Sequence, residues 1–380
     1  MQVILVSVDA LVTEDLEVLR TLPFTGKLLE RASVIKRCTP IFPTHTYPCH
    51  ASIMTGLTAS GTGIIKNKNP DGTWAWYRSS IKAPILTDIL KRHGLKTAAV
   101  CWPVLGGADI DYLVPEIWAD GPTDDPTKRF RSASSPEGFE YYELYKAELD
   151  WMRTPGMDDF AADCFDAIMR DHSPDFAALH LSYLDHQKHG NGAETYKNTG
   201  ALRFIDEKLQ TALSHVREDA VIFIMGDHGH RNYSSYVSLP AILKKEGIEG
   251  IVTESASYMA FAYGRNCERL KSLAGKYPVE CVMTPDEAES RYGLSGSFDA
   301  VLTSADGFIF RDMEEMTKGA GAVMSDHGFS NEKGPFPPLV TIGYETEADE
   351  CRSVDVAPTI LSLFDLELKC DGRVIPGHIR

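Results

Sequence analysis

Several short apolar runs in this sequence end in an aspartate or an Asp-His pair, and this recurrence constrains the fold more than any other feature. The runs at 3–8, 176–183, 220–225 and 321–324 are each followed by such residues. Between them lie amphipathic stretches, of which 202–216 is the longest. Alternating strands and helices are typical of a mostly parallel sheet with helices on both faces, and such sheets bind ligands beyond the carboxyl ends of their strands. The sequence therefore predicts an α/β fold with a functional site at that edge.

Two segments depart from this alternation of strands and helices. Residues 105–160 are rich in Gly, Pro, Asp, Ser and aromatic side chains, and we expect them to form loops that cover the site. Residues 240–312 mix short strands with a helix, which predicts a small inserted α+β subdomain. The catalytic domain would then comprise residues 1–239 and 313–380. A chain of 380 residues is long enough to bury a large core.

The charge balance limits the kinds of partner. The chain has 54 acidic and 38 basic residues, which argues against binding of a nucleic acid polymer because that requires clustered Lys and Arg. A small phosphate-containing substrate remains compatible, since a bound metal ion can invert the local field. No apolar run approaches the roughly 18 residues of a membrane helix, and the eight scattered cysteines are typical of reduced thiols. We expect a cytoplasmic protein without membrane contact, and the sequence indicates no oligomeric state.

The aspartates and histidines after the apolar runs have the chemistry of a metal site. Asp185 and His189 are four residues apart, so on a helical turn both side chains would face the same way. Carboxylates and imidazoles without cysteine suit Zn²⁺ or Mn²⁺, and their number suits two ions about 3.5–4 Å apart. Taken singly, each motif could equally be an ordinary turn. The candidate ligands are Asp9, Asp185, His189, Asp227, His228, Asp326 and His327.

A candidate nucleophile, Thr46, lies in the stretch Phe-Pro-Thr-His-Thr-Tyr-Pro-Cys-His, between two prolines. The apolar residues that follow predict a helix, and Pro48 suits its first turn. Thr46 would then lie at a helix N-terminus, where the dipole favours an anion and backbone N–H groups can hold phosphate oxygens. Threonine is also a common N-cap residue, so this position alone does not establish a nucleophile.

Together these motifs resemble the alkaline phosphatase superfamily, and within it the nucleotide pyrophosphatase/phosphodiesterase branch, which includes phosphonoacetate hydrolase. The matching features are Asp9 after an apolar strand, the Phe-Pro-Thr-x-Thr-x-Pro-x-His stretch, Asp185-x-x-x-His189, Asp227-His228-Gly and the late His327-Gly. The resemblance covers roughly residues 1–104, 174–235 and 320–366. It implies an alkaline phosphatase-like α/β fold.

The resemblance also implies two divalent metal ions, most simply Zn²⁺ with Mn²⁺ as the alternative. The first ion would be held by Asp9, Asp227, His228 and the Thr46 hydroxyl. The second ion would be held by Asp185, His189 and His327. The first ion would lower the pKa of the Thr46 hydroxyl. A phospho-threonine intermediate would form, and water activated by the second ion would release it.

For the substrate, the resemblance implies that Asn67 donates a hydrogen bond to a non-bridging phosphate oxygen, together with the N–H of Tyr47. A neutral amide suits a monoanionic diester or a phosphonate, whereas monoesterases of the superfamily typically combine Ser with an Arg clamp. Lys66 and Lys68 flank Asn67. They could bind a substrate carboxylate or phosphate, or lie solvated in a loop.

We therefore expect a metal-dependent hydrolase of phosphodiester or pyrophosphate-type bonds that acts on a small phosphoester or phosphonate. Three alternatives stay open: a phosphonoacetate-type C–P hydrolase, a phosphomutase of the same superfamily, and a non-catalytic metal-binding protein. Asp326 departs from the branch, which more often has a small residue there, and we expect it to be structural or to support a ligand. His186 and His230 neighbour candidate ligands without an assigned role.

Overall fold

The fold is built on a large, mostly parallel β-sheet. A computed structural model describes residues 1–69, 71–119, 121, 123–149 and 155–380. The sheet has the order β2-β15-β7-β1-β6-β4-β5, in which the five strands from β7 to β5 are parallel and β15 is antiparallel to both neighbours. Its strands are β1 (Val3–Val8), β2 (Ser33–Ile35), β4 (Thr97–Val100), β5 (Tyr112–Val114), β6 (Phe176–Leu181), β7 (Val221–Met225) and β15 (Leu339–Ile342). This arrangement confirms the predicted α/β fold.

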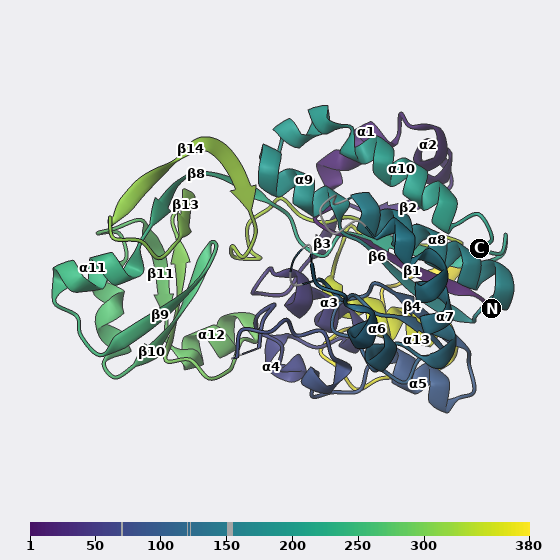
Figure 1. Ribbon diagram of the computed structural model, residues 1–380, viewed down its shortest axis with the longest axis horizontal. Helices are drawn as coiled ribbons and strands as arrows, with labels where there is room; N and C mark the ends of the chain where they lie inside the picture. The colour runs from purple at the N-terminus through teal and green to yellow at the C-terminus, as the bar shows by residue number, and fades with distance from the viewer. Residues whose placement is uncertain (70, 120, 122, 150–154) are drawn as a thin grey trace.

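Two layers of helices enclose the sheet. In Figure 1, α1, α2 and α10 lie above its strands and α5 and α13 lie below them. All six residues of β1 are buried, as expected for a strand covered on both faces. No helix in the described part of the chain is both long and apolar enough to cross a membrane. The helices around the sheet include α1 (Leu16–Leu19), α2 (Pro23–Glu30), α3 (Thr46–Thr55), α4 (Ala59–Thr62), α5 (Leu86–Arg92), α8 (Pro155–His172), α9 (Tyr183–Asn191), α10 (Ala201–Ala212) and α13 (Val356–Ser362).

Short strands tie the ends of the chain to the domain. β3 pairs with β17 in parallel, and β16 pairs with β18 in antiparallel orientation. The β3–β17 pair joins the segment before α3 to the segment before α13, so both chain ends contribute to the region around α3. These strands are β3 (Arg37–Thr39), β16 (Tyr344–Glu345), β17 (Glu350–Arg352) and β18 (His378–Ile379).

The chain between β7 and β15 forms a second lobe, at the left of Figure 1. It contains a sheet of order β11-β12-β10-β9 and a sheet of order β13-β8-β14. β8 and β14, which pair with each other, lie on either side of the range 240–312 that the sequence predicts for the subdomain. The lobe consists of β8 (Arg231–Val237), α11 (Leu239–Glu246), β9 (Ile251–Ala256), β10 (Met259–Gly264), β11 (Val279–Met283), α12 (Pro285–Tyr292), β12 (Ala300–Ser304), β13 (Gly307–Phe310) and β14 (Thr317–Asp326).

The segment expected to be loops at 105–160 also contains helices α6 (Thr127–Ala133) and α7 (Pro136–Tyr145) and the start of α8. Ser and Pro, which suggested a loop, here begin a helix: Ser135 caps α7 by accepting a hydrogen bond from the Gly138 N–H, and Pro136 occupies its first turn. Within this segment, residues 120, 122 and 150–154 lie outside the described residues.

A buried ion pair anchors α9 to the chain after β1. Lys188 Nζ lies 2.8 Å from Asp15 Oδ2 and 2.7 Å from the carbonyl oxygen of Ala10, and both charged side chains are about 1% exposed. Tyr196 donates a further hydrogen bond to Asp15. Because α9 also carries Asp185 and His189, the pair fixes the helix that presents two candidate ligands.

Replacing Lys188 with methionine should lower the free energy of unfolding by about 3–5 kcal/mol, because the carboxylate of Asp15 would stay buried without its cation. Urea denaturation followed by circular dichroism measures the change. Lys197→Met, at an exposed position nearby, should alter stability by no more than about 0.5 kcal/mol. A loss below about 1 kcal/mol for Lys188→Met would contradict a structural role for this pair.

Candidate metal centre and active site

The carboxyl ends of β1, β6 and β7 bring the candidate ligands together. Asp9 follows β1, Asp227 and His228 follow β7, and Asp185 lies in the first turn of α9 after β6. His327 arrives from the second lobe, directly after β14. The ligand atoms form two groups, each within 4.8 Å: Asp9, Asp185 and His228 in one, and Asp185, His189, His230 and His327 in the other. Asp185 therefore belongs to both groups, whereas the family resemblance assigns it to the second metal ion alone.

The first group surrounds His228 Nε2. This nitrogen lies 3.3 Å from Thr46 Oγ1, 3.2 Å from Asp227 Oδ2 and 3.5 Å from Asp9 Oδ1. Both carboxylate oxygens are buried and accept no hydrogen bond from the described residues. A buried carboxylate oxygen without a partner is costly unless a cation is nearby. The donor set of oxygens and one imidazole fits a divalent metal ion.

The carboxylates of this group affect one another's protonation. Burial, followed by the negative charges of Asp227 and Asp185, raises the pKa of Asp9 well above its usual value. Burial likewise raises the pKa of Asp227 to about 6. Burial lowers the pKa of His228, which keeps its imidazole neutral as a metal ligand must be. A divalent cation would offset the repulsion between the carboxylates.

The second group combines one carboxylate with imidazoles. His189 Nε2 lies 3.4 Å from Asp185 Oδ2, so the four-residue spacing places both on one face of α9, as predicted. His327 contacts the carbonyl oxygen of Thr44 through Nδ1 at 3.1 Å. That nitrogen must carry the proton, which leaves Nε2 with a lone pair for a metal ion. Asp326, whose role the sequence left open, lies 3.8 Å from His189 Nδ1.

Thr46 is the first residue of α3, and the N-cap position belongs to His45. The Thr46 hydroxyl therefore does not cap the helix, and instead faces His228. His50, one turn later, donates from Nδ1 to the carbonyl oxygen of Thr46 at 2.8 Å. α3 ends at Gly56 in the left-handed conformation (φ 68°). The helix thus directs its N-terminus at the first ligand group.

Asn67 lies directly beside the start of α3, which carries the candidate nucleophile Thr46. The backbone N–H of Tyr47 donates to Asn67 Oδ1 at 3.0 Å. The resemblance implies that this N–H donates to a phosphate oxygen of the substrate. In the structure the N–H is not free, and a phosphate oxygen would have to share it with Asn67. The same bond orients the amide, so that Asn67 Nδ2 is the donor left for a substrate.

A model of the type I phosphodiesterase/nucleotide pyrophosphatase family matches residues 3–308 of the chain. The chain belongs to this family. Ectonucleotide pyrophosphatase/phosphodiesterase family member 1 of Homo sapiens is 25% identical over 233 residues, which cover 55% of this chain and 21% of that protein. Its Mus musculus counterpart is 24% identical over 229 residues, with the same coverage. The match therefore spans only a minor part of these curated relatives.

Solved structures of the same fold include murine ectonucleotide pyrophosphatase/phosphodiesterase 5. Its inactive threonine-to-alanine variant in complex with AMP has a TM-score of 0.74 and 17% identity, and the match covers 98% of this chain and 97% of that one. Phosphonoacetate hydrolase of Sinorhizobium meliloti 1021 in complex with phosphonoacetate has a TM-score of 0.72 and 17% identity, with 94% of each chain covered. At such identities these matches establish the fold.

In this phosphodiesterase-family chain, the two lysines that flank Asn67 differ in their contacts. Lys66 Nζ lies 2.6 Å from Glu254 Oε2 and 3.3 Å from the Tyr263 hydroxyl, both on the second lobe. Lys68 is exposed, and its Nζ lies 5.3 Å from the centre of the Trp74 ring. Lys66 is thus neither a solvated loop residue nor a free cation, because it pairs across the two lobes.

Sequence reasoning missed two buried residues that hold Asp9 in place. His180 Nε2 lies 3.1 Å from Asp9 Oδ2, and His180 Nδ1 lies 3.0 Å from Glu116 Oε2. Burial disfavours the charged imidazole, but the hydrogen bonds and charges of both carboxylates outweigh it and raise the pKa of His180 well above its usual value. Glu116 Oε1 accepts a 2.6 Å hydrogen bond from the Tyr47 hydroxyl. The sequence gives one indication of this role, because His180 is the single histidine within the otherwise apolar run of β6.

The variant Glu116→Gln should weaken metal binding at the first group by about 10–100-fold, because Glu116 and His180 orient Asp9 so that Oδ1 faces His228. Competition with a chromophoric chelator measures the dissociation constant. Glu137→Gln, at an exposed position on α7, serves as the matched control and should bind as the wild type does. Equal affinities for both variants would contradict the positioning role.

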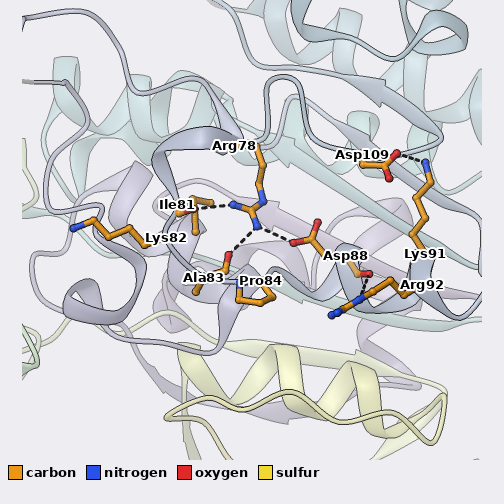
Figure 2. Close-up of a pocket in the computed structure, with 9 residues that line it drawn as sticks. All are labelled: Arg78, Ile81, Lys82, Ala83, Pro84, Asp88, Lys91, Arg92 and Asp109. Carbon is orange, nitrogen blue, oxygen red and sulfur yellow. Dashed lines mark hydrogen bonds and ion pairs between the residues drawn. The ribbon is translucent and has the colours of Figure 1, made fainter.

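A separate surface pocket lies beside α5 and contains none of the candidate ligands (Figure 2). Three of its four cationic side chains, those of Arg78, Lys91 and Arg92, already have partners. Arg78 Nη2 lies 2.7 Å from Asp88 Oδ2 and 2.8 Å from the carbonyl oxygen of Ala83, and Lys91 pairs with Asp109. The candidate ligands at the sheet edge therefore lie outside this pocket.

Proposed function

We propose that this chain is a metal-dependent hydrolase that cleaves phosphodiester or pyrophosphate-type bonds of small molecules, with Thr46 as the nucleophile. The observation that carries the proposal is the convergence of the Thr46 hydroxyl, His228 Nε2 and the unpaired carboxylate oxygens of Asp9 and Asp227. A hydroxyl in such a donor set lies where a cation can activate it. The family match and the AMP complex of the murine relative support a nucleotide-like phosphoester as substrate.

The residues at the sheet edge fit two divalent ions, with Zn²⁺ or Mn²⁺ compatible with oxygen and imidazole donors. When bound, the ions would supply Lewis-acid activation of a hydroxyl and of a water at neutral pH. The first ion would be held by Asp9, Asp227, His228 and Thr46. The second would be held by Asp185, His189 and His327.

The chain's own groups carry the displacement. Thr46 Oγ1 attacks phosphorus, the leaving alkoxide or phosphate departs, and water later cleaves the phospho-threonine to regenerate Thr46. The positive end of the α3 dipole stabilises the negative charge that develops on phosphate. Asn67 Nδ2 donates to a non-bridging oxygen. Because this donor is neutral, a monoanionic diester should bind better than a dianionic monoester.

A phosphonoacetate-type C–P hydrolase is the second candidate, because phosphonoacetate hydrolase shares the fold. Such an enzyme needs cations for the substrate carboxylate, and the ion pair of Lys66 with Glu254 makes that residue less suitable. A phosphomutase would keep the phosphoryl group for transfer and normally uses Ser in place of Thr46. A non-catalytic metal-binding protein would show no turnover.

The test is p-nitrophenol release by metal-loaded protein from three substrates: the p-nitrophenyl ester of thymidine 5′-phosphate, bis-p-nitrophenyl phosphate and p-nitrophenyl phosphate. We expect diester turnover well above monoester turnover, and loss of both in a chelated control. A preference for the monoester would refute the assignment of Asn67. If no substrate releases p-nitrophenol, phosphate release from phosphonoacetate would identify the C–P hydrolase.

A further inference from the structure

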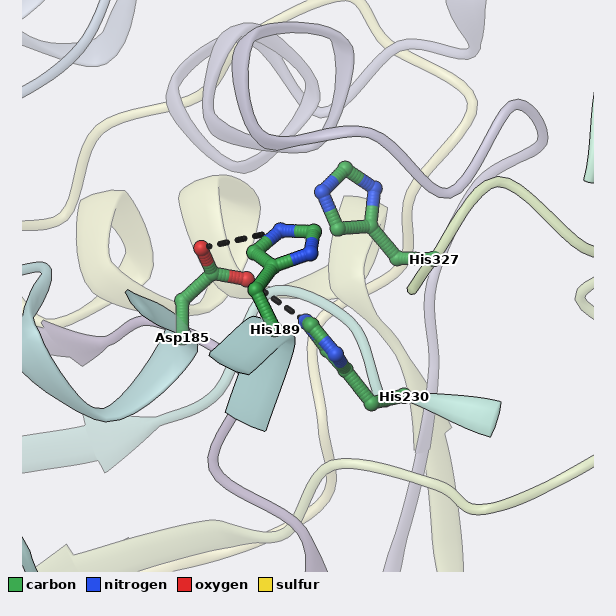
Figure 3. A group of neighbouring side chains, drawn as sticks. All are labelled: Asp185, His189, His230 and His327. Atoms are coloured by element: carbon green, nitrogen blue, oxygen red, sulfur yellow. Dashed lines mark hydrogen bonds and ion pairs between the residues drawn. The ribbon is translucent and has the colours of Figure 1, made fainter. Parts of the chain in front are cut away.

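We infer that His230 is a fourth protein ligand of the second metal ion, together with Asp185, His189 and His327. This inference rests on the proposed function, since it concerns an ion that the function requires. Figure 3 shows the side chains of Asp185, His189, His230 and His327 gathered in one place. Asp185 and His189 belong to α9, His230 directly precedes β8, and His327 directly follows β14. One ligand atom from each lies within 4.8 Å of the others.

The hydrogen bonds of His230 determine which of its nitrogens can bind a metal ion. The hydroxyl of Ser325 donates its single proton to the carbonyl oxygen of Lys188 at 2.6 Å. His230 Nδ1 lies 3.0 Å from the same hydroxyl oxygen. Because Ser325 has no second proton to donate, it must accept from His230, and Nδ1 therefore carries a proton. In a neutral imidazole this leaves Nε2 with an exposed lone pair.

That lone pair faces a carboxylate, which is unfavourable unless a positive charge lies between them. His230 Nε2 is 2.6 Å from Asp185 Oδ1, and neither atom would have a proton to share. A metal ion bound by both atoms removes this conflict, in the arrangement typical of ligating histidines, whose other ring N–H donates to an oxygen. The alternative is a doubly protonated His230 that only orients Asp185.

A fourth protein ligand changes which metal ion the second site prefers. Three imidazoles with one carboxylate form a nitrogen-rich set that favours Zn²⁺ over Mn²⁺, whereas the first group is richer in oxygen. We therefore expect the second site to bind Zn²⁺ more tightly than a site with three protein ligands.

The test compares metal-free and reloaded full-length protein with the variants His230→Ala and His230→Asn. The asparagine variant keeps a donor that can hold Asp185 but is a poor Zn²⁺ ligand. His186→Ala, which alters an exposed histidine outside both groups, is the matched control. Zn²⁺ dissociation constants come from competition with a chromophoric chelator, and the visible spectrum of Co²⁺-loaded protein reports the coordination number directly.

We expect both His230 variants to weaken the binding of the second Zn²⁺ by more than about 100-fold and to change the Co²⁺ spectrum. Such a loss exceeds the usual effect of removing a residue that only hydrogen-bonds a metal ligand. His186→Ala should match the wild type. Wild-type affinity and spectrum in His230→Asn would overturn the inference and leave His230 as a positioning residue for Asp185. A wild-type protein that binds fewer than two ions would refute the two-metal function itself.

Discussion

Replacing Thr46 with alanine should lower phosphodiester turnover roughly 10³-fold or more and leave metal binding intact. In the proposed mechanism the Thr46 hydroxyl forms the covalent bond to phosphorus, while the remaining donors around His228 Nε2 stay in place in the variant. The measurement is kcat on the p-nitrophenyl ester of thymidine 5′-phosphate, with metal content determined on the same sample. Thr46→Ser, which restores a hydroxyl, should recover part of the rate.

The matched control for this variant is Thr211→Ala on α10, where the hydroxyl donates to the carbonyl oxygen of Glu207 in its own helix. Its kcat should lie within about twofold of the wild type, since surface substitutions of this kind have small effects. Acid quenching during turnover, followed by peptide mass spectrometry, should find phosphate on the peptide that contains Thr46. Turnover of Thr46→Ala within about tenfold of the wild type would refute the nucleophile assignment.

Removal of divalent ions should abolish turnover and lower the melting temperature by several degrees. Asp9 and Asp227 are buried, and the half-buried Asp185 lies close to Asp9. A cation that binds only the folded state stabilises it by about 4 kcal/mol when its free concentration is 1,000-fold above Kd. Differential scanning calorimetry with and without a chelator measures the shift. Added Zn²⁺ should restore both activity and stability, and an unchanged melting temperature would contradict the metal centre.

The pH dependence of the metal-free protein provides a second readout. Burial raises the pKa of Asp227 from 3.8 to about 6, so the folded state binds a proton that the unfolded state has released. Stability of the metal-free protein should therefore fall as pH rises from about 4 to about 6. Bound metal should remove this decrease, and Asp227→Asn should remove it without metal. The same slope in Asp227→Asn would assign it to other groups.

Patterns among neighbouring residues of the sequence predict much of the architecture. The continuous apolar run of β1 required a strand buried on both faces, and the spacing of Asp185 and His189 placed both side chains on one face of α9. The recurrence of aspartates after such runs indicated the sheet edge where ligands gather. These features depend on the period of a helix or strand, which is a property of neighbouring residues.

Tertiary structure alone decided which distant groups meet and in which protonation state. Glu116 and His180 are 64 positions apart, and Lys66 and Glu254 are 188 apart, yet each pair is in direct contact. The boundary of the second lobe likewise depends on the pairing of β8 with β14, which are about 80 residues apart in the sequence. The inference that His230 binds a metal ion depends on the hydroxyl of Ser325 in β14. Packing between elements, and not the spacing of residues within an element, determines which hydrogen bonds such a buried side chain can make.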